Sequence, residues 1–232
     1  SYAKCDKLIE IEAFIATTNT AELGSIADRL YDQKHYKACR IIYESVGNNA
    51  RLASCLVYLK EYQKAILAAK KANQPKCWKE VCFACVKGGE FRLAAQAGGN
   101  IIIHPDLVDE LISGFEAYGA YSELISLFES NLNQERNHIY TELAILYAKY
   151  QEEKLMDYCR NYYEKFNVPK VIRICELHYH WNEVVFLHCH YNGHDSAIEV
   201  MIQHSPICYK HDLFTQTLQK VSNTLLFNDA LR

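Results

Sequence analysis

The sequence predicts an all-α protein built from stacked antiparallel helix pairs. An apolar pattern at positions i, i+3, i+4 and i+7, which marks one face of an α-helix, recurs through nearly all of the 232 residues. It returns about every 30 residues in two interleaved series that alternate along the chain. A single pair is too thin to bury its apolar stripe, so we expect the pairs to stack as a helical-repeat array.

Each predicted helix is centred on one stripe. The first series covers residues 23–30, 52–59, 78–85, 108–115, 140–147 and 171–178. The second series covers residues 62–69, 91–98, 121–128, 155–162 and 181–188. Weaker stripes lie at 8–15, 36–43, 197–204 and 214–221. The count predicts about seven pairs and a leading helix in a single continuous segment, 1–232. Because an isolated array needs polar caps and a further apolar segment starts at 225–227, we interpret the chain as a fragment of a longer array.

Proline and glycine predict the boundaries of these elements. A proline is tolerated in the first turn of a helix, because its missing N–H would have no intrahelical partner there. The prolines that stand ahead of stripes, and so predict boundaries between pairs, are Pro75, Pro105, Pro169 and Pro206. Tight bends inside pairs are predicted at Lys60-Glu61, Gly88-Gly89 and Gly119.

Composition narrows the class of protein. A formal net charge of -3 argues against a nucleic-acid binder, which needs clustered Lys and Arg. The sequence has no apolar run near the roughly 18 to 20 residues that span a bilayer and no apolar leader at Ser1, so we expect a cytosolic protein or a fragment of one. Several of the ten cysteines fall on the stripes, which favours buried, reduced thiols over a disulfide framework.

Several sequence strings resemble the leg repeats of the clathrin heavy chain, in that family's order and spacing. The strings are RLAS at 51–54, EYQ at 61–63, WKEVCFACV at 78–86, EFRLA at 90–94, TELAILY at 141–147 and VPKV at 168–171. Weaker matches are DRLYD at 28–32, ER at 135–136 and VFL at 185–187, so the resemblance covers nearly the whole chain. The resemblance implies a right-handed α-solenoid of short helix pairs.

The same resemblance implies a mechanical function. Heavy chains of that family join as trimers, and their legs interweave into a lattice that supports budding of coated vesicles in endocytosis. This chain is similar to the proximal leg, which lies beside other legs and carries the light chain. The family's trimerisation segment and adaptor-binding propeller have no counterpart here. We therefore expect a cytoplasmic scaffold, on the cytoplasmic face of coated pits and vesicles, that meets the membrane only through the coat.

One residue is singled out as a light-chain contact. In that family a Lys that follows the Leu-Tyr of the TELA string is a partner of the acidic light-chain helix, and Lys149 occupies that position. The alternative is a solvated lysine at a helix end, where an ion pair on the surface would contribute under about 1 kcal/mol to stability. Glu152 and Glu153 stand where the family has a bend with Lys and Pro, and these acids would repel an acidic helix.

Metal and redox chemistry are the alternatives for the cysteines and histidines. Cys82 and Cys85 form a CxxC, but a zinc site needs a second pair and a redox pair needs a βαβ context, so packing explains them better. The stretch from His178 to His194 is rich in histidine and could form a metal-binding module. On a helix His178 and His180 would point about 200° apart, whereas His178 and His188 share the i+7 position of adjacent helices.

A pH-dependent function is a further hypothesis for these histidines. Histidine titrates near neutral pH, and the resembled lattice assembles more readily in mild acid.

The sequence contains no nucleophile elbow, glycine-rich phosphate loop or paired-carboxylate motif, so we expect no catalysis, no cofactor and no resident metal. The preferred interpretation is a coat scaffold. A repeat segment of a vacuolar sorting or tethering subunit is the alternative within scaffolds.

Overall fold

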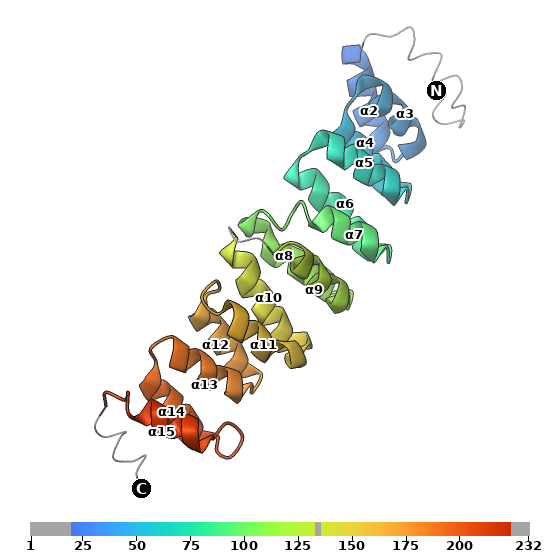
Figure 1. Ribbon diagram of the computed structural model, residues 1–232. Helices are drawn as coiled ribbons and strands as arrows, with labels where there is room; N and C mark the ends of the chain where they lie inside the picture. The colour runs from blue at the N-terminus through green and yellow to red at the C-terminus, as the bar shows by residue number, and fades with distance from the viewer. Residues whose placement is uncertain (1–19, 133–135, 224–232) are drawn as a thin grey trace. The chain divides into compact units, whose positions relative to one another are not determined.

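The computed structural model describes residues 20–132 and 136–223, and within them the chain forms fourteen α-helices and no strand (Figure 1). This confirms the all-α prediction. The chain divides into two compact units, Ser1–Leu127 and Phe128–Arg232, here called unit 1 and unit 2. The stripe predicted at 8–15 and the apolar segment at 225–227 lie outside the described residues. The single continuous array over residues 1–232 stays a prediction.

Unit 1 consists of helix pairs that pack on one another in chain order. Its helices are α2 (Thr20–Asp32), α3 (Tyr36–Val46), α4 (Asn49–Tyr58), α5 (Tyr62–Ala72), α6 (Pro75–Lys87), α7 (Phe91–Gly98), α8 (Pro105–Glu116) and the first part of α9 (Tyr121–Ser130). Helices α2 and α3, α4 and α5, and α6 and α7 contact as pairs. Each pair also contacts the next, through α3 with α4 and α5 with α6.

Unit 2 repeats this arrangement. After the end of α9 it contains α10 (Asn137–Tyr150), α11 (Glu152–Tyr162), α12 (Val168–Leu177), α13 (Trp181–His190), α14 (His194–Gln203) and α15 (His211–Leu218). Helix α10 pairs with α11, α12 with α13 and α14 with α15, while α10 contacts α12 and α11 contacts α13. Within each unit the fold is therefore a stack of helix pairs, as the alternating stripes predicted.

The cores of both units are built from the predicted stripes. In α8, Val108, Leu111, Ile112 and Phe115 are all buried, and in α6 the buried set includes Val81, Cys82 and Cys85. The i+3 and i+4 positions face the neighbouring helices most directly, whereas the first and last positions of a stripe often lie near a helix end. Helix α10 is buried on almost every side, so the TELAILY string forms core and not an outer face.

A charged residue on the weak stripe of α3 has a structural explanation. Arg40 is half-buried, and its Nη1 atom pairs with Oε1 of Glu61 at 2.9 Å. Glu61 also pairs with Nζ of Lys64 at 2.7 Å. The ion pair lets the guanidinium lie between two helix pairs, which is why Arg40 interrupts the apolar pattern without breaking the helix.

The bends inside five pairs share one backbone geometry. One residue in each bend has a positive φ, and these residues are Lys34, Lys60, Gly89, Gly119 and Tyr179. The next residue donates its N–H to a carbonyl five positions earlier, as in Glu61 to Leu56 at 2.9 Å and Glu90 to Cys85 at 2.9 Å. This is the Schellman arrangement that closes a helix C-terminus. The bend between α10 and α11 differs, because Gln151 there has a φ of -144°.

Three of the four prolines lie where they were predicted. Pro75 and Pro105 begin α6 and α8, and Pro169 is in the first turn of α12. Pro206 does not separate two pairs, so the prediction was wrong there. It lies between α14 and α15, inside the last pair, in a loop that lacks the tight bend of the other pairs and runs from His204 to Lys210.

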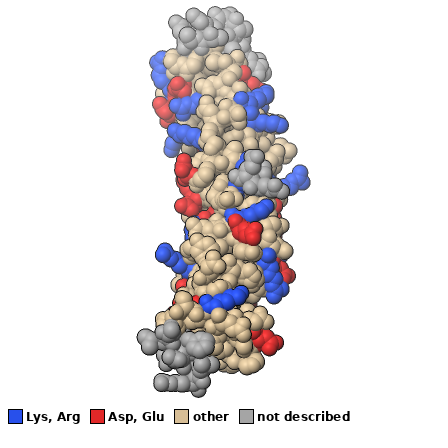
Figure 2. Space-filling model, turned by 60° about the vertical axis from the view of Figure 1, so that its left-hand side comes forward, with Lys and Arg blue, Asp and Glu red and all other residues tan. Residues whose placement is uncertain are grey.

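The outer faces carry a mixture of charges. In the view of Figure 2, basic and acidic side chains are interspersed within each unit, separated by uncharged surface. Several of them form ion pairs, among them Lys79 with Glu110 at 2.7 Å and Lys170 with Glu142 at 2.6 Å. Such pairs are exposed or partly exposed and contribute little each to stability.

Candidate functional site

Lys149 lies in the last turn of α10 and is half-buried. Tyr150, the last residue of the helix, is exposed, and Glu152 and Glu153 begin α11 directly after the bend at Gln151. Both carboxylates are exposed. The structure thus places two acidic side chains directly after Lys149 in the chain, beyond the C-terminal end of the buried helix α10. The sequence had indicated this. The role of Lys149 as a light-chain contact stays a prediction.

A polar network on the same helices was not predicted. Oε1 of Glu129 in α9 accepts a hydrogen bond from the Tyr147 hydroxyl at 2.6 Å and pairs with Nζ of Lys154 at 3.0 Å. Burial raises the pKa of Glu129, but the two donors outweigh it and hold that pKa below its usual value. Burial, together with this hydrogen bond, raises the pKa of Tyr147 above its usual range. Lys154 is therefore engaged with Glu129 and does not offset Glu152 and Glu153.

The CxxC cysteines are part of the core. Cys82 and Cys85 are both fully buried in α6, and the Cys82 thiol donates to the Ala94 carbonyl at 3.3 Å. Burial raises the pKa of Cys82 to about 12 and that of Cys85 to about 11. Metal binding and disulfide exchange both require thiolates. The positions of these thiols therefore favour packing, as predicted.

His178 and His180 do not point apart as predicted. Helix α12 ends at Leu177, so His178 is its C-cap residue and His180 is the N-cap residue of α13. The helical angle does not apply across this bend, and the two rings stack with centroids 6.2 Å apart and planes 12° apart. Nε2 of His180 also lies 2.8 Å from the Ala148 carbonyl.

The remaining histidines lie in separate packing environments. The His190 ring packs on Phe186 at 4.1 Å, and His204 stacks on Trp181 at 3.5 Å between ring centroids. His188 is half-buried, and no ring contact or hydrogen bond joins it to His178 in the part of the chain that is described. Burial lowers the pKa of His188, with Glu176 and Glu199 acting in the opposite direction.

A metal-binding module finds no support in this geometry. Among residues 20–132 and 136–223 the structure contains no group of three or more His, Cys, Asp or Glu side chains placed to hold a metal ion. The described cysteines are free thiols, and His178, His180 and His190 contact neighbouring rings or backbone carbonyls instead of converging.

An unpredicted groove lies on unit 1, where α4, α6 and α8 adjoin. It has a volume of about 520 Å³, and aromatic residues from all three helices or their ends line it, namely Tyr58, Phe83 and Tyr118. The tyrosines at the ends of first helices were visible in the sequence, but nothing marked them as neighbours.

No described helix is both long enough and apolar enough to cross a membrane.

Stacked helix pairs whose apolar stripes are buried, and whose charged residues lie mainly on the outer faces, define a helical-repeat protein. A family profile described as "Region in Clathrin and VPS" matches residues 1–93 and 100–232. The clathrin heavy chain of Dictyostelium discoideum is 46% identical over 233 aligned residues. Clathrin heavy chain 2 of Oryza sativa subsp. japonica and clathrin heavy chain 1 of Arabidopsis thaliana are each 45% identical over the same length.

The chain belongs to the clathrin heavy-chain repeat family. Each of these alignments covers 100% of this chain and 14% of the relative, so the chain spans about one seventh of the length of the heavy chains it matches. The family profile covers vacuolar sorting proteins as well, but these relatives are clathrin heavy chains. The resemblance seen in the sequence strings is thereby confirmed.

Proposed function

We propose that the chain is a structural, non-enzymatic segment of the leg of a clathrin-type heavy chain, in a coat on the cytoplasmic face of budding vesicles. The observation that carries this proposal is the identity of 45–46% over the full chain, across both units. The fold supports it, because a stack of nearest-neighbour contacts distributes stiffness along its length and presents long outer faces. The same match supports the proposal that the array is continuous over residues 1–232.

The proposed partners are other heavy-chain legs and a light chain. Leg contacts can each be weak, because many linked contacts act at a high effective concentration and still permit disassembly. The mixed charge of the outer faces suits such reversible contacts. The coat would meet the membrane only through other components.

The scaffold function is tested on the longer heavy chain purified from the cells that produce it. We expect trimers that carry a small acidic helical partner and that assemble into closed lattices, visible by electron microscopy. Recovery in a complex with vacuolar sorting or tethering subunits, with no lattice, would instead favour that alternative.

The light-chain contact at Lys149 is tested by charge reversal in the same heavy chain. If an acidic helix lies on Lys149, Lys149→Glu lowers the amount of light chain that co-purifies. The matched control is Lys76→Glu, which makes the same change at an exposed lysine of α6. The double variant Glu152→Gln with Glu153→Gln removes the two nearby negative charges and should increase light-chain retention. Equal retention in all variants would place the light chain elsewhere.

A further inference from the structure

The groove on unit 1 runs along the outer face of α6. Glu80, Phe83, Ala84 and Lys87 all line it, and their spacing of i, i+3, i+4 and i+7 places them on one stripe of that helix. This stripe is distinct from the buried stripe that starts at Trp78. Tyr58 from the end of α4 and Tyr118 from the end of α8 also line the groove, and they are 55% and 52% exposed.

The floor of the groove depends on one glycine. The Phe83 ring lies against α8 at Gly114, where a Cβ atom would stand 2.5 Å from Cε1 of the ring. Real Cβ contacts are not that close, so the ring can occupy this position only because residue 114 has no side chain. Because residue 114 is glycine, the Phe83 ring can lie against α8 and form the floor of the groove, between the two tyrosines.

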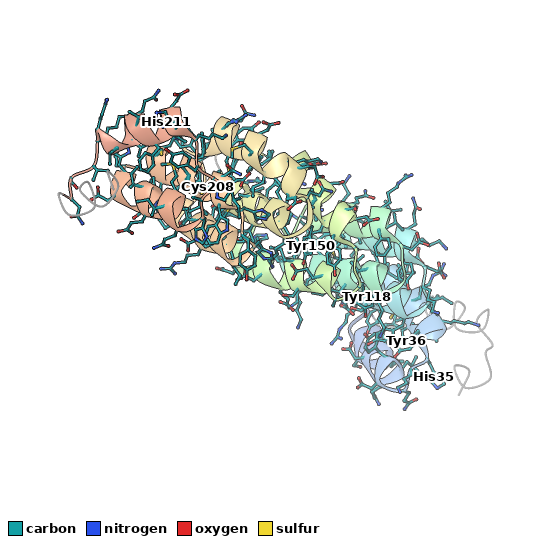
Figure 3. All side chains as sticks on the ribbon, turned by 90° about the horizontal axis from the view of Figure 1, so that it is seen from below. His35, Tyr36, Tyr118, Tyr150, Cys208 and His211 are labelled. Carbon is teal, nitrogen blue, oxygen red and sulfur yellow. The ribbon has the colours of Figure 1, made fainter. Side chains whose placement is uncertain are left out.

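One wall of the groove is held in place by other tyrosines. Tyr36 stacks on Tyr58 with ring centroids 4.4 Å apart and planes 3° apart, and Tyr31 meets Tyr58 edge-on at 6.0 Å. Figure 3 labels Tyr36 near the start of α3 and Tyr118 after α8. A ring fixed before binding loses little conformational freedom when a ligand packs against it. The wall is therefore preorganised while more than half of Tyr58 stays exposed.

The charges of the groove differ between its two ends. Oε2 of Glu80 accepts a hydrogen bond from the Ser54 hydroxyl at 2.6 Å, and no cationic side chain pairs with it in the described residues. The other carboxylate of the lining, Glu110, is already paired with Lys79 at 2.7 Å. Lys87 stands seven residues after Glu80, which on a helix is roughly 10 Å along the axis. The groove thus offers a carboxylate at one end and an ammonium group at the other.

We propose that this groove binds a proline-rich segment of a partner protein that carries an arginine and an acidic residue three positions apart. Proline-rich segments adopt the polyproline II conformation and dock in grooves lined with aromatic side chains. That conformation rises about 3.1 Å per residue with three residues per turn, so residues three apart lie on one face, roughly 9 Å from each other. This matches the separation of Glu80 and Lys87. The prolines lie on the other two faces of that helix, where they would pack on Tyr58 and Tyr118, on either side of Phe83.

An amphipathic α-helix is the alternative occupant of this surface, and the experiment below distinguishes it from a proline-rich segment. The proposed binding does not depend on coat assembly, because every contributing residue lies in unit 1.

The test uses the purified 232-residue chain and a fluorescein-labelled peptide of sequence PPRPPDPP, read by fluorescence anisotropy. We expect saturable binding that weakens about tenfold with Tyr118→Ala, because truncating an aromatic anchor of a binding site costs at least this much. Gly114→Ala should weaken binding similarly by lifting Phe83 into the groove. Glu80→Gln should reduce the preference for PPRPPDPP over PPDPPDPP.

Tyr150→Ala is the matched control, since Tyr150 ends the first helix of its pair as Tyr58 does but lies in unit 2. It should leave affinity unchanged within about twofold. Circular dichroism and thermal melting show whether each variant is folded, and Tyr118→Ala keeps the test valid if Gly114→Ala does not fold. Equal binding of the peptide AARAADAA, or unchanged affinity in Tyr118→Ala, would overturn the proposal.

Two other occupants are distinguished by the same variants. If sedimentation shows that the chain self-associates, and Tyr118→Ala abolishes this while PPRPPDPP does not bind, the groove is a contact between copies and the proposal is wrong. The proposal is also wrong if an amphipathic helical peptide binds the groove more tightly than PPRPPDPP and loses affinity with Tyr118→Ala.

Discussion

The Thr141 hydroxyl connects two successive helix pairs of unit 2 by accepting a hydrogen bond from the backbone N–H of Asn167 at 3.0 Å. The same hydroxyl donates to the Asn137 carbonyl within α10 at 3.1 Å. Asn167 in turn caps α12, since its Oδ1 accepts from the Lys170 N–H at 3.1 Å. One buried hydroxyl thus fixes where the next pair starts.

Thr141→Val should destabilise the chain by about 1–3 kcal/mol. Valine has the shape of threonine but cannot accept a hydrogen bond, so the Asn167 N–H would lose its partner in a part-buried position. Urea unfolding followed by circular dichroism measures the loss. The control is Thr215→Val, because the exposed Thr215 hydroxyl donates only to the His211 carbonyl of its own helix. A change of similar size in both variants would contradict this role of Thr141.

Glu129 and Glu183 should affect acid stability with opposite signs. The pKa of Glu129 is lowered, so its ionised form adds stability that is present above about pH 4.5 and is lost as the pH falls through its folded-state pKa. Glu129→Gln should therefore be less stable than the parent chain at pH 7, and the difference should shrink towards pH 3. Thermal melting across this range measures it.

Burial of Glu183 raises its pKa, so its ionised form lowers stability at neutral pH. Glu183→Gln should be more stable than the parent chain at pH 7, with a difference that also disappears in acid. The two variants serve as controls for each other, because each changes one carboxylate to an amide. A destabilised Glu183→Gln at neutral pH would show that this carboxylate has a compensating partner.

His188 should make the folded chain sensitive to mild acid. Its pKa is lowered by burial, so the folded state favours the neutral ring, and stability is lost as the pH falls through about 6.5 towards the folded-state pKa. His188→Gln should lose less stability between about pH 7 and pH 5 than the parent chain does. His190→Gln, at an exposed position of the same helix, is the control.

The assembly hypothesis for these histidines stays a prediction. If they contribute, the full-length heavy chain with His178→Gln and His188→Gln assembles with an altered pH dependence. Because His178 stacks on His180 and not on His188, each single variant is needed to separate the two rings. An unchanged pH profile of assembly in the double variant would rule the histidines out.

The buried thiols should react slowly with alkylating agents. Burial raises the pKa of all three thiols, but Cys82 and Cys85 are fully buried, whereas Cys189 is half-buried. Among the cysteines that the structure describes, mass spectrometry after a timed reaction with iodoacetamide should show labelling of Cys189 first, and of Cys82 only on unfolding. EDTA should leave the melting temperature unchanged. A drop in melting temperature with EDTA would show a metal that the packing interpretation does not include.

The apolar stripes predicted the helices because burial of one helix face is a property of local spacing. They failed where a helix ends. His178 and His204 hold the last position of their stripes, but each is the C-cap residue of its helix. The direction of such a side chain depends on the bend and not on the helical period, which is why His178 and His180 stack.

The candidate site was predicted only where a familiar string marked it, as at Lys149. The groove depends on Phe83 fitting over Gly114, two residues separated by 31 positions that no periodicity relates. The Glu129–Tyr147 hydrogen bond likewise joins neighbouring helices through side chains whose burial was predictable for Tyr147 but whose partner was not. Both the groove and this hydrogen bond depend on how neighbouring helix pairs pack, which the apolar spacing does not specify.

The shared bend geometry has a consequence for how such a chain can vary. The hydrogen bonds that close these bends run between backbone atoms, so the bend residue itself is lysine in two pairs, glycine in two others and tyrosine at Tyr179. The turn tips can therefore carry different side chains, within the limits that a positive φ sets, while the helix that follows keeps its starting direction. A protein built this way can diversify the residues at its turn tips without changing its frame.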